Sequence, residues 1–233
     1  LAAVIMEPIH GEEPQKDFLK KVRTLADKAG AVLVFDEITM GFRLTLGGAH
    51  LKYGVMPDMA IFAKGMSNGY PMAAIIGRQK VMQAAQDTFI SSTYWTERVG
   101  PVAALATIRA MQKHKVQKRL AILGRQVKKV WQTAARKHGL TLSVSGVDPL
   151  LFFAFSGEQA QVMKTVFVIE MLKRGFLAST LYYPSYAHTD ADVARYAKAV
   201  DGAFGIIAAA QAQGALPQLL KTPAAHTGFA RLN

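Results

Sequence analysis

Residues 57–77 read PDMAIFAKGMSNGYPMAAIIG and hold a lysine, Lys64, between two apolar runs. The first run, residues 59–63, leads directly into Lys64, and a glycine-containing turn separates it from the second, residues 72–76. Short apolar runs bounded by glycine and proline are typical of buried strands. A lysine at the end of such a strand is partly desolvated, which disfavours its charge, and a neutral amine can form a Schiff base with an aldehyde. The alternative is a surface lysine that caps a strand.

A second stretch, residues 31–43 (AVLVFDEITMGFR), changes from apolar to acidic at its middle. Residues 31–35 are continuously apolar, which is the pattern of a strand covered on both faces of a parallel sheet. The run ends at Asp36 and Glu37, and the carboxyl ends of strands form the edge at which α/β sheets bind ligands. The alternative for Asp36 is an ordinary loop acid or a helix cap.

The segment in front of these stretches predicts a β-α-β unit. Residues 1–6 are strand-like, and residues 14–29 carry apolar side chains at spacings of three and four, as in an amphipathic helix. Gly30 follows as the expected C-cap of that helix, directly before the strand of residues 31–35. Strand, helix and strand at this length predict a sheet that is at least partly parallel.

The neighbourhood of Lys64 is expected to contain a long loop and further strands. Residues 39–57 predict a glycine-containing loop, and loops of this length in compact domains are usually functional. Strands are expected at residues 58–62 and 72–77, and a short helix at residues 79–86.

The second half of the chain has the pattern of a smaller α+β domain. Two alternating segments, residues 140–144 and 150–155, predict an antiparallel pair joined by a turn. The other expected elements are helices at residues 101–114, 116–137, 159–173 and 189–212 and a short strand at residues 175–178. We therefore expect three parts, which are the large-domain portion at residues 1–115, the small α+β domain at residues 116–213 and an extension of low order at residues 214–233.

The amino-acid composition favours some classes of protein and argues against others. Of the 233 residues, 51% are hydrophobic and 19% are charged, which is typical of a folded globular protein. The sequence has no cysteine and no apolar run of the ~18 residues that a membrane helix needs, so we expect a cytoplasmic protein without disulfides or a membrane span. The histidines show no metal-ligand spacing, so no metal site is expected. The net charge of +12 raises nucleic acid as a partner, but dispersed basic residues favour solvated helix faces.

An ordered series of motifs resembles the class III aminotransferases, which depend on pyridoxal 5′-phosphate (PLP), and within them the glutamate-1-semialdehyde aminomutase-like branch. The motifs are Glu7-Pro8, Asp36-Glu37-Ile38-Thr39-Met40-Gly41-Phe42-Arg43, Gly47-Gly48, Pro57-Asp58, Ala63-Lys64-Gly65 and Ala187-His188-Thr189-Asp190. The resemblance implies the aspartate aminotransferase fold (fold type I), with a large-domain sheet and a C-terminal α+β small domain. It also implies that a complete enzyme has a comparable stretch before Leu1, with a loop for the cofactor phosphate.

The resemblance assigns roles around the cofactor to three residues. Lys64 would form the Schiff base with PLP and, once released by a substrate amine, would move a proton as general acid and base. Asp36 would pair with the protonated pyridine nitrogen, which makes the ring an electron sink. Ile38 would lie on the ring face.

Thr93 resembles the threonine that reaches the cofactor phosphate of a neighbouring subunit. This role implies a homodimer with a shared active site. The loop before Pro101 is longer than the family pattern, so Ser91, Ser92 and Thr96 are competing candidates.

Substrate contacts are expected from three further side chains. Arg43 could bind a substrate carboxylate as a fork or form a structural salt bridge. Tyr182 and Tyr183 are expected to shape the substrate pocket. Thr39 departs from the family, because many members have a glutamine there that bonds the ring hydroxyl.

The leading hypothesis is a PLP-dependent aminotransferase that moves an amino group between an amino donor and a keto acid or aldehyde. A second hypothesis is an intramolecular aminomutase, although residues 178–184, before the AHTD motif, lack the glutamate that such enzymes carry. A hypothesis of another class is a non-catalytic, basic derivative that binds nucleic acid.

Overall fold

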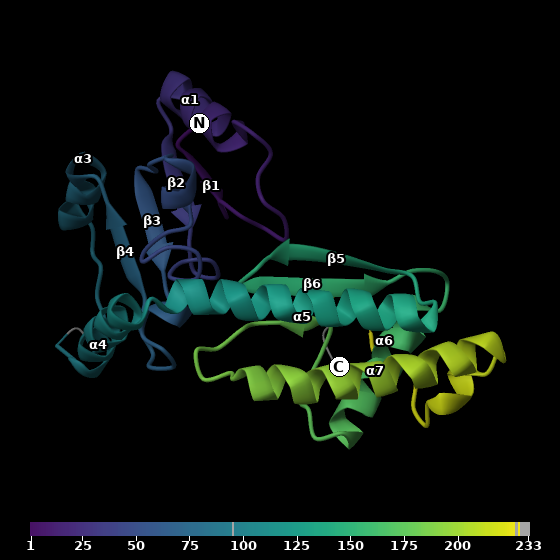
Figure 1. The fold of residues 1–233 in the computed structure, drawn as a ribbon. Coiled ribbons are helices and arrows are strands. Elements are labelled where there is room, and N and C mark those ends of the chain that lie inside the picture. The colour runs from purple at the N-terminus through teal and green to yellow at the C-terminus, as the bar shows by residue number, and fades with distance from the viewer. Residues whose placement is uncertain (95, 227, 229–233) are drawn as a thin grey trace. The chain divides into compact units, whose positions relative to one another are not determined.

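Three parallel strands and one antiparallel strand form the sheet of the first half. The computed structural model describes residues 1–94, 96–226 and 228. Across the sheet the order is β1 (Ala3–Met6), β2 (Val32–Asp36), β3 (Met59–Phe62) and β4 (Ala74–Gly77), as Figure 1 shows. Strands β1, β2 and β3 run parallel, and β4 runs antiparallel to β3. The predicted α/β class and the β-α-β unit are confirmed.

Helix α1 (Phe18–Ala29) covers one face of β1 and β2. Leu19 and Ala26 are buried against Leu33 and Phe35, as the apolar spacing of the helix requires. Gly30 has φ 64° and ends the helix in the left-handed conformation, as predicted. The predicted start at residue 14 is wrong, because Asp17 itself has φ 62°, which no α-helix accommodates.

The segments around β3 contain more helix than the sequence pattern predicted. The loop expected at residues 39–57 includes the one-turn helix α2 (His50–Tyr53), which Gly54 ends with φ 64°. The short helix expected at residues 79–86 is split into α3 (Gln79–Met82) and a 3-10 turn. That turn spans Gln83–Asp87 and precedes the long helix α4 (Val99–His114).

Asp58 anchors the start of β3 to the neighbouring elements. Its carboxylate accepts hydrogen bonds from the amide of Leu33 (2.8 Å) and from Arg23 of α1 (2.7 Å), and it lies 3.1 Å from Arg78. Burial opposes ionisation of this group, but the Leu33 amide and Arg23 outweigh burial and hold the pKa of Asp58 below its ordinary value of 3.8. Asp58 therefore ties β2, β3 and α1 together in its ionised form.

Replacing Asp58 with asparagine is expected to lower the free energy of unfolding by about 3 kcal/mol at pH 7, because the new amide group faces the donors of Leu33 and Arg23. In the wild type the folded-state pKa is the lower one, so the unfolded chain binds more protons in acid. The stabilisation is present above the ordinary pKa and is lost as the pH falls from about 5 through the folded-state pKa. The variant should lack this acid-dependent loss. Urea unfolding between pH 3 and 7 measures both effects.

The matched control is Asp27→Asn, which removes the other carboxylate partner of Arg23 at an exposed position. It is expected to change stability by less than about 1 kcal/mol. Equal losses in the two variants would contradict the anchoring role of Asp58.

The second half of the chain is built on a three-stranded antiparallel sheet. Its strands are β5 (Leu142–Val147), β6 (Leu150–Phe155) and β7 (Leu181–Tyr182), in that order. The predicted antiparallel pair is confirmed, with a tighter turn than expected. The strand expected at residues 175–178 is wrong, because the backbone that pairs with β6 lies at Leu181 and Tyr182.

In the described part of this half, three helices and an aromatic cluster accompany the sheet. The helices are α5 (Val116–His138), α6 (Ala160–Lys173) and α7 (Asp190–Ala212). Thr189 caps α7 in a capping box with Asp192, and the hydrogen bonds from Thr189 lower the pKa of Asp192. The core places the rings of Trp131, Phe153 and Phe204 together, with ring centroids 4.8 and 5.8 Å from that of Phe153.

The extension predicted at residues 214–233 is ordered at its start. Leu216 is fully buried in the core of the second half and begins a 3-10 turn, Leu216–Leu219. The prediction of low order is therefore wrong for this part, because a leucine in an apolar core fixes the backbone that carries it. Residues 227 and 229–233 of the predicted extension lie outside the described residues.

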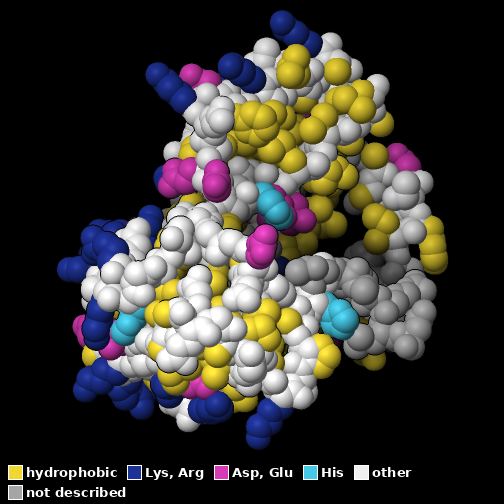
Figure 2. All heavy atoms as spheres, turned by 90° about the vertical axis from the view of Figure 1, so that its right-hand side faces the viewer, with side chains coloured by type: hydrophobic (Ala, Val, Ile, Leu, Met, Phe, Trp, Pro, Cys, Tyr) yellow, Lys and Arg dark blue, Asp and Glu magenta, His cyan; other side chains and the backbone are white. Residues whose placement is uncertain are grey.

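The chain separates into two compact units, Leu1–Arg119 and Leu120–Asn233. The boundary falls in the first turn of α5, four residues after the position expected from the sequence. Lys and Arg side chains stand out at several separate places in Figure 2. Some basic side chains form ion pairs, as Arg125 does with Asp148. Among the described residues, no helix has both the length and the apolar content to cross a membrane.

Candidate active site

Asp36 and Lys64 follow neighbouring parallel strands at the same edge of the sheet. Asp36 is the last residue of β2 and pairs in register with Ile61 of β3. Lys64 comes two residues after the end of β3. Because parallel strands end at a common edge, the carboxylate and the amine are both presented where α/β sheets bind ligands.

Lys64 is held in a strained backbone conformation by the turn that carries it. It begins a 3-10 turn, Lys64–Met66, with φ 48°, a left-handed value that costs a non-glycine residue about 1–2 kcal/mol. Phe42 and Asn68 also have positive φ, at 63° and 52°. Such strain persists where surrounding contacts over-determine the backbone, and it gathers at functional sites.

The amine of Lys64 contacts the segment that follows Asp36. Its Nζ donates a hydrogen bond to Oγ1 of Thr39, with 2.9 Å between the atoms. The side chain is exposed, so a ligand can reach it. In the sequence, Thr39 stands out only as a departure from the family, and its position three residues after Asp36 is the one signal for this contact.

Asp36 and Ile38 are half-buried beside this contact. Oδ1 of Asp36 accepts a hydrogen bond from the amide of Ile38 at 2.9 Å, which fixes the carboxylate at the end of β2. The same segment holds Arg43, whose Nε donates to the carbonyl oxygen of Thr39 at 2.8 Å. This hydrogen bond places the side chain of Arg43 on the loop around Thr39.

A second pair of functional groups in this segment was missed by sequence analysis. Glu37 is fully buried, and its carboxylate meets the ring of the nearly buried His50, with 2.7 Å between Oε1 and Nδ1. The sequence gives little signal for this pair, because the two residues are separated by the whole loop between β2 and α2.

Thr93 lies in an exposed turn of the first unit, between the 3-10 turn Gln83–Asp87 and α4. Its competitors Ser91, Ser92 and Thr96 lie in the same exposed segment. Ser92 Oγ accepts a hydrogen bond from the amide of Tyr94 at 3.3 Å.

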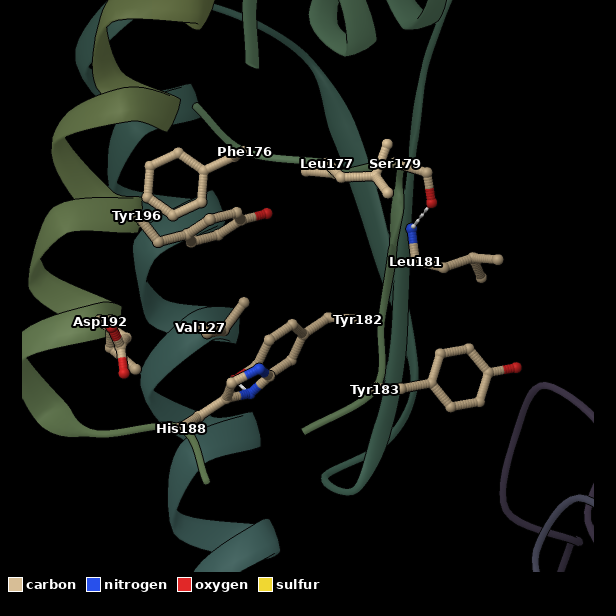
Figure 3. Close-up of a pocket in the computed structure, with 12 residues that line it drawn as sticks. Val127, Phe176, Leu177, Ser179, Leu181, Tyr182, Tyr183, His188, Asp192 and Tyr196 are labelled. Atoms are coloured by element: carbon tan, nitrogen blue, oxygen red, sulfur yellow. Dashed lines mark hydrogen bonds between the residues drawn. The ribbon is translucent and has the colours of Figure 1, made fainter. Parts of the chain in front are cut away.

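Tyr182 and Tyr183 line a cavity of about 490 Å³ in the second unit. Figure 3 shows Tyr182 beside His188, while Tyr183, one residue after β7, points away from both. The rings of Tyr182 and His188 are stacked with centroids 5.8 Å apart, and Tyr182 Oη lies 3.2 Å from Nδ1 of His188. Burial raises the pKa of Tyr196, which lines the same cavity and accepts a hydrogen bond from Trp131.

The model of the family described as aminotransferase class-III matches residues 1–204 of this chain. The chain belongs to the class III aminotransferase family.

Two curated relatives show how this aminotransferase chain compares with whole enzymes. It is 32% identical over 212 residues to the 3-aminobutyryl-CoA aminotransferase of Cloacimonas acidaminovorans (strain Evry), covering 86% of this chain and 51% of the relative. It is 30% identical over 227 residues to the glutamate-1-semialdehyde 2,1-aminomutase of Ignicoccus hospitalis (strain KIN4/I), covering 89% of this chain and 54% of the relative. The chain thus spans about half the length of these relatives.

A solved structure supports the same fold for this class III chain. The structure of the PLP internal aldimine form of the Sphingopyxis sp. MTA144 FumI protein superposes with a TM-score of 0.84 at 27% identity. The match covers 94% of this chain and 55% of that protein. The predicted PLP-dependent transferase fold (fold type I) is therefore confirmed.

The family and the PLP-bound relative point to pyridoxal 5′-phosphate as the cofactor. The residues at the sheet edge fit it chemically. An exposed primary amine on a fixed turn suits an aldehyde, and a carboxylate anchored at a strand end suits a protonated ring nitrogen. Both groups lie in the first unit, at the ends of adjacent strands.

Proposed function

We propose that the protein is a PLP-dependent aminotransferase that moves an amino group between a small-molecule amino donor and a keto acid or aldehyde. The observation that carries the proposal is the placing of Asp36 and Lys64 at the ends of two adjacent parallel strands. The family of the chain supports the same reaction class. When bound, the cofactor supplies an aldehyde for the substrate amine and a ring that withdraws electrons from the substrate α-carbon.

Lys64 is the proposed catalytic residue. Its Nζ would hold the cofactor at its aldehyde carbon, and once a substrate amine had taken that place the freed amine would accept the proton of the substrate α-carbon. The φ of 48° at Lys64 and the hydrogen bond to Thr39 support this role, because they fix the position of the amine before it reacts. A base that is already held near the substrate proton avoids the entropy cost of bringing the two reacting groups together.

Asp36 and Ile38 are the proposed cofactor-binding residues on β2 and its end. Asp36 holds a proton on the ring nitrogen through its charge, which acts strongly because the carboxylate is half-buried. The amide of Ile38 orients this carboxylate. The half-buried side chain of Ile38 would exclude water from one face of the ring.

Thr93 is proposed to bind the cofactor phosphate in a neighbouring copy of the chain. Its exposed position in a turn supports this role, because a hydroxyl on an exposed loop is accessible to a second subunit. The proposed assembly is accordingly a homodimer in which each active site uses residues of both copies. Arg43, Tyr182 and Tyr183 are proposed to contact the substrate.

The reaction class is tested by assaying the protein with PLP against a panel of amino donors, keto acids and aldehydes. The panel includes 3-aminobutyryl-CoA and glutamate-1-semialdehyde, the compounds named in the two curated relatives. We expect an acceptor to gain an amino group only when a donor is present. Rearrangement of glutamate-1-semialdehyde without any donor would instead establish an aminomutase. Failure to bind PLP, with no turnover of any pair, would contradict the proposal.

A further inference from the structure

The buried pair Glu37 and His50 closes the loop that carries Thr39. The amide of Glu37 extends the pairing of β2 with β3 by donating to Ile61 at 2.9 Å, so its backbone is part of the sheet. Its side chain reaches back over the loop to the start of α2. The pair therefore joins the end of a central strand to the far end of the loop between Glu37 and His50.

Both carboxylate oxygens of Glu37 accept hydrogen bonds from the far end of the loop. Oε2 accepts from the amide of Ala49 at 2.8 Å, and Oε1 accepts from the amide of His50 at 2.9 Å and meets Nδ1 of the same residue at 2.7 Å. The side chain is 0% exposed and that of His50 is 6% exposed. A buried carboxylate is tolerated only when such donors surround it, so the arrangement is specific.

The closed loop also fits tightly around its own backbone. A Cβ at Gly48 would overlap the ring of His50, and a Cβ at Gly41 would lie 2.6 Å from the carbonyl oxygen of Glu37. Inside the loop, the amide of Phe42 donates to Gly47 at 2.7 Å. These contacts leave the backbone of the loop little conformational freedom once Glu37 and His50 are in contact.

Thr39 carries the contact from this loop to the amine of Lys64. Its hydroxyl accepts from Nζ of Lys64, and its carbonyl accepts from Nε of Arg43. The contacts run from the buried carboxylate of Glu37, through the closed backbone, to the amine of Lys64.

We infer that Glu37 and His50 are positioning residues that hold the Thr39 hydroxyl against the amine of Lys64. The inference rests on the proposed function for its role in catalysis, because it concerns the same amine. The predicted consequence is that loss of the buried pair changes the reactivity of Lys64 from a distance, through Thr39.

The test measures the rate at which Lys64 reacts with an amine-acylating reagent in the cofactor-free protein. Peptide mass spectrometry follows the label, and the exposed Lys80 serves as an internal standard. Thr39→Val removes the acceptor that holds the amine, so labelling of Lys64 should rise about three- to tenfold, as loss of one hydrogen bond allows. Thr39→Ser should restore the wild-type rate.

Glu37→Gln is nearly the same size but must place an NH₂ group against an N–H donor, so it should raise the labelling rate as Thr39→Val does. His50→Asn tests the same closure from the other side if the glutamine variant does not fold. The double variant Glu37→Gln/Thr39→Val should label no faster than Thr39→Val alone, because both changes act on one contact. The matched control is Glu170→Gln, which removes a buried carboxylate of the second unit and should leave Lys64 labelling unchanged.

Wild-type labelling in the folded Glu37→Gln or His50→Asn variant, or additive rates in the double variant, would overturn the inference. Because no cofactor is present, this result is independent of the proposed function, which fails separately if the protein does not bind PLP. In the PLP-loaded protein, Glu37→Gln should lower kcat about threefold or more with a smaller change in KM, as expected when only the catalytic amine is misplaced.

Discussion

Replacing Lys64 with alanine is expected to abolish stable attachment of PLP and to lower amino-group transfer by about 10³-fold or more. The variant loses both the amine that binds the cofactor aldehyde and the base that moves the substrate proton. The measurements are the visible absorbance of the PLP-loaded protein, peptide mapping after borohydride reduction, and kcat for the best substrate pair. The wild type should carry the cofactor mass on the peptide that contains Lys64.

The matched control for this prediction is Lys80→Ala, which removes an exposed lysine of α3 in the same unit. Its absorbance and kcat should equal those of the wild type. An unchanged absorbance band in Lys64→Ala, or attachment of the cofactor to a different lysine, would rule out the assignment of Lys64.

Replacing Asp36 with asparagine is expected to lower kcat by about 10²- to 10³-fold, the size of effect seen when one preorganised electrostatic contact is removed from an active site. An uncharged amide cannot hold the proton on the ring nitrogen as a half-buried carboxylate does. Lys64 is still present, so the cofactor should remain attached. The measurements are kcat, KM and the absorbance of the bound cofactor, with kcat expected to fall far more than KM rises.

Asp87→Asn, at an exposed position of the 3-10 turn after α3, is the control for the change of charge. It should leave kcat unchanged. A wild-type kcat in Asp36→Asn would mean that the ring nitrogen does not depend on this carboxylate and would remove Asp36 from the proposed site. Together with the Lys64 variant, this result separates binding of the cofactor from its activation.

The sequence alone determined that Asp36 and Lys64 follow neighbouring strands of the sheet. Apolar runs that end at Asp36 and just before Lys64 predicted strands β2 and β3, and the helix between β1 and β2 predicted that the strands are parallel. These features are local, because a strand that is buried on both faces shows a continuous apolar run in its own sequence. The order of the motifs also determined the family, which the match over residues 1–204 confirms.

Some errors of prediction came from elements that are too short to carry a periodic pattern. Helix α2 is one turn long, so four residues cannot display a helical repeat. The strand expected at residues 175–178 failed for another reason. Strand propensity does not say which backbone segment reaches the open side of β6, and Leu181–Tyr182 takes that place.

What the tertiary structure decided is which side chains meet around the amine. Thr39 contacts Lys64, and Glu37 contacts His50, across loops that no sequence spacing relates. Such contacts depend on the conformation of the loop that covers the edge of the sheet. That conformation is determined by burial and by the need to satisfy every buried donor and acceptor. The sequence therefore determined the strands that present the amine and the carboxylate, whereas the folded loop determined what holds the amine in place.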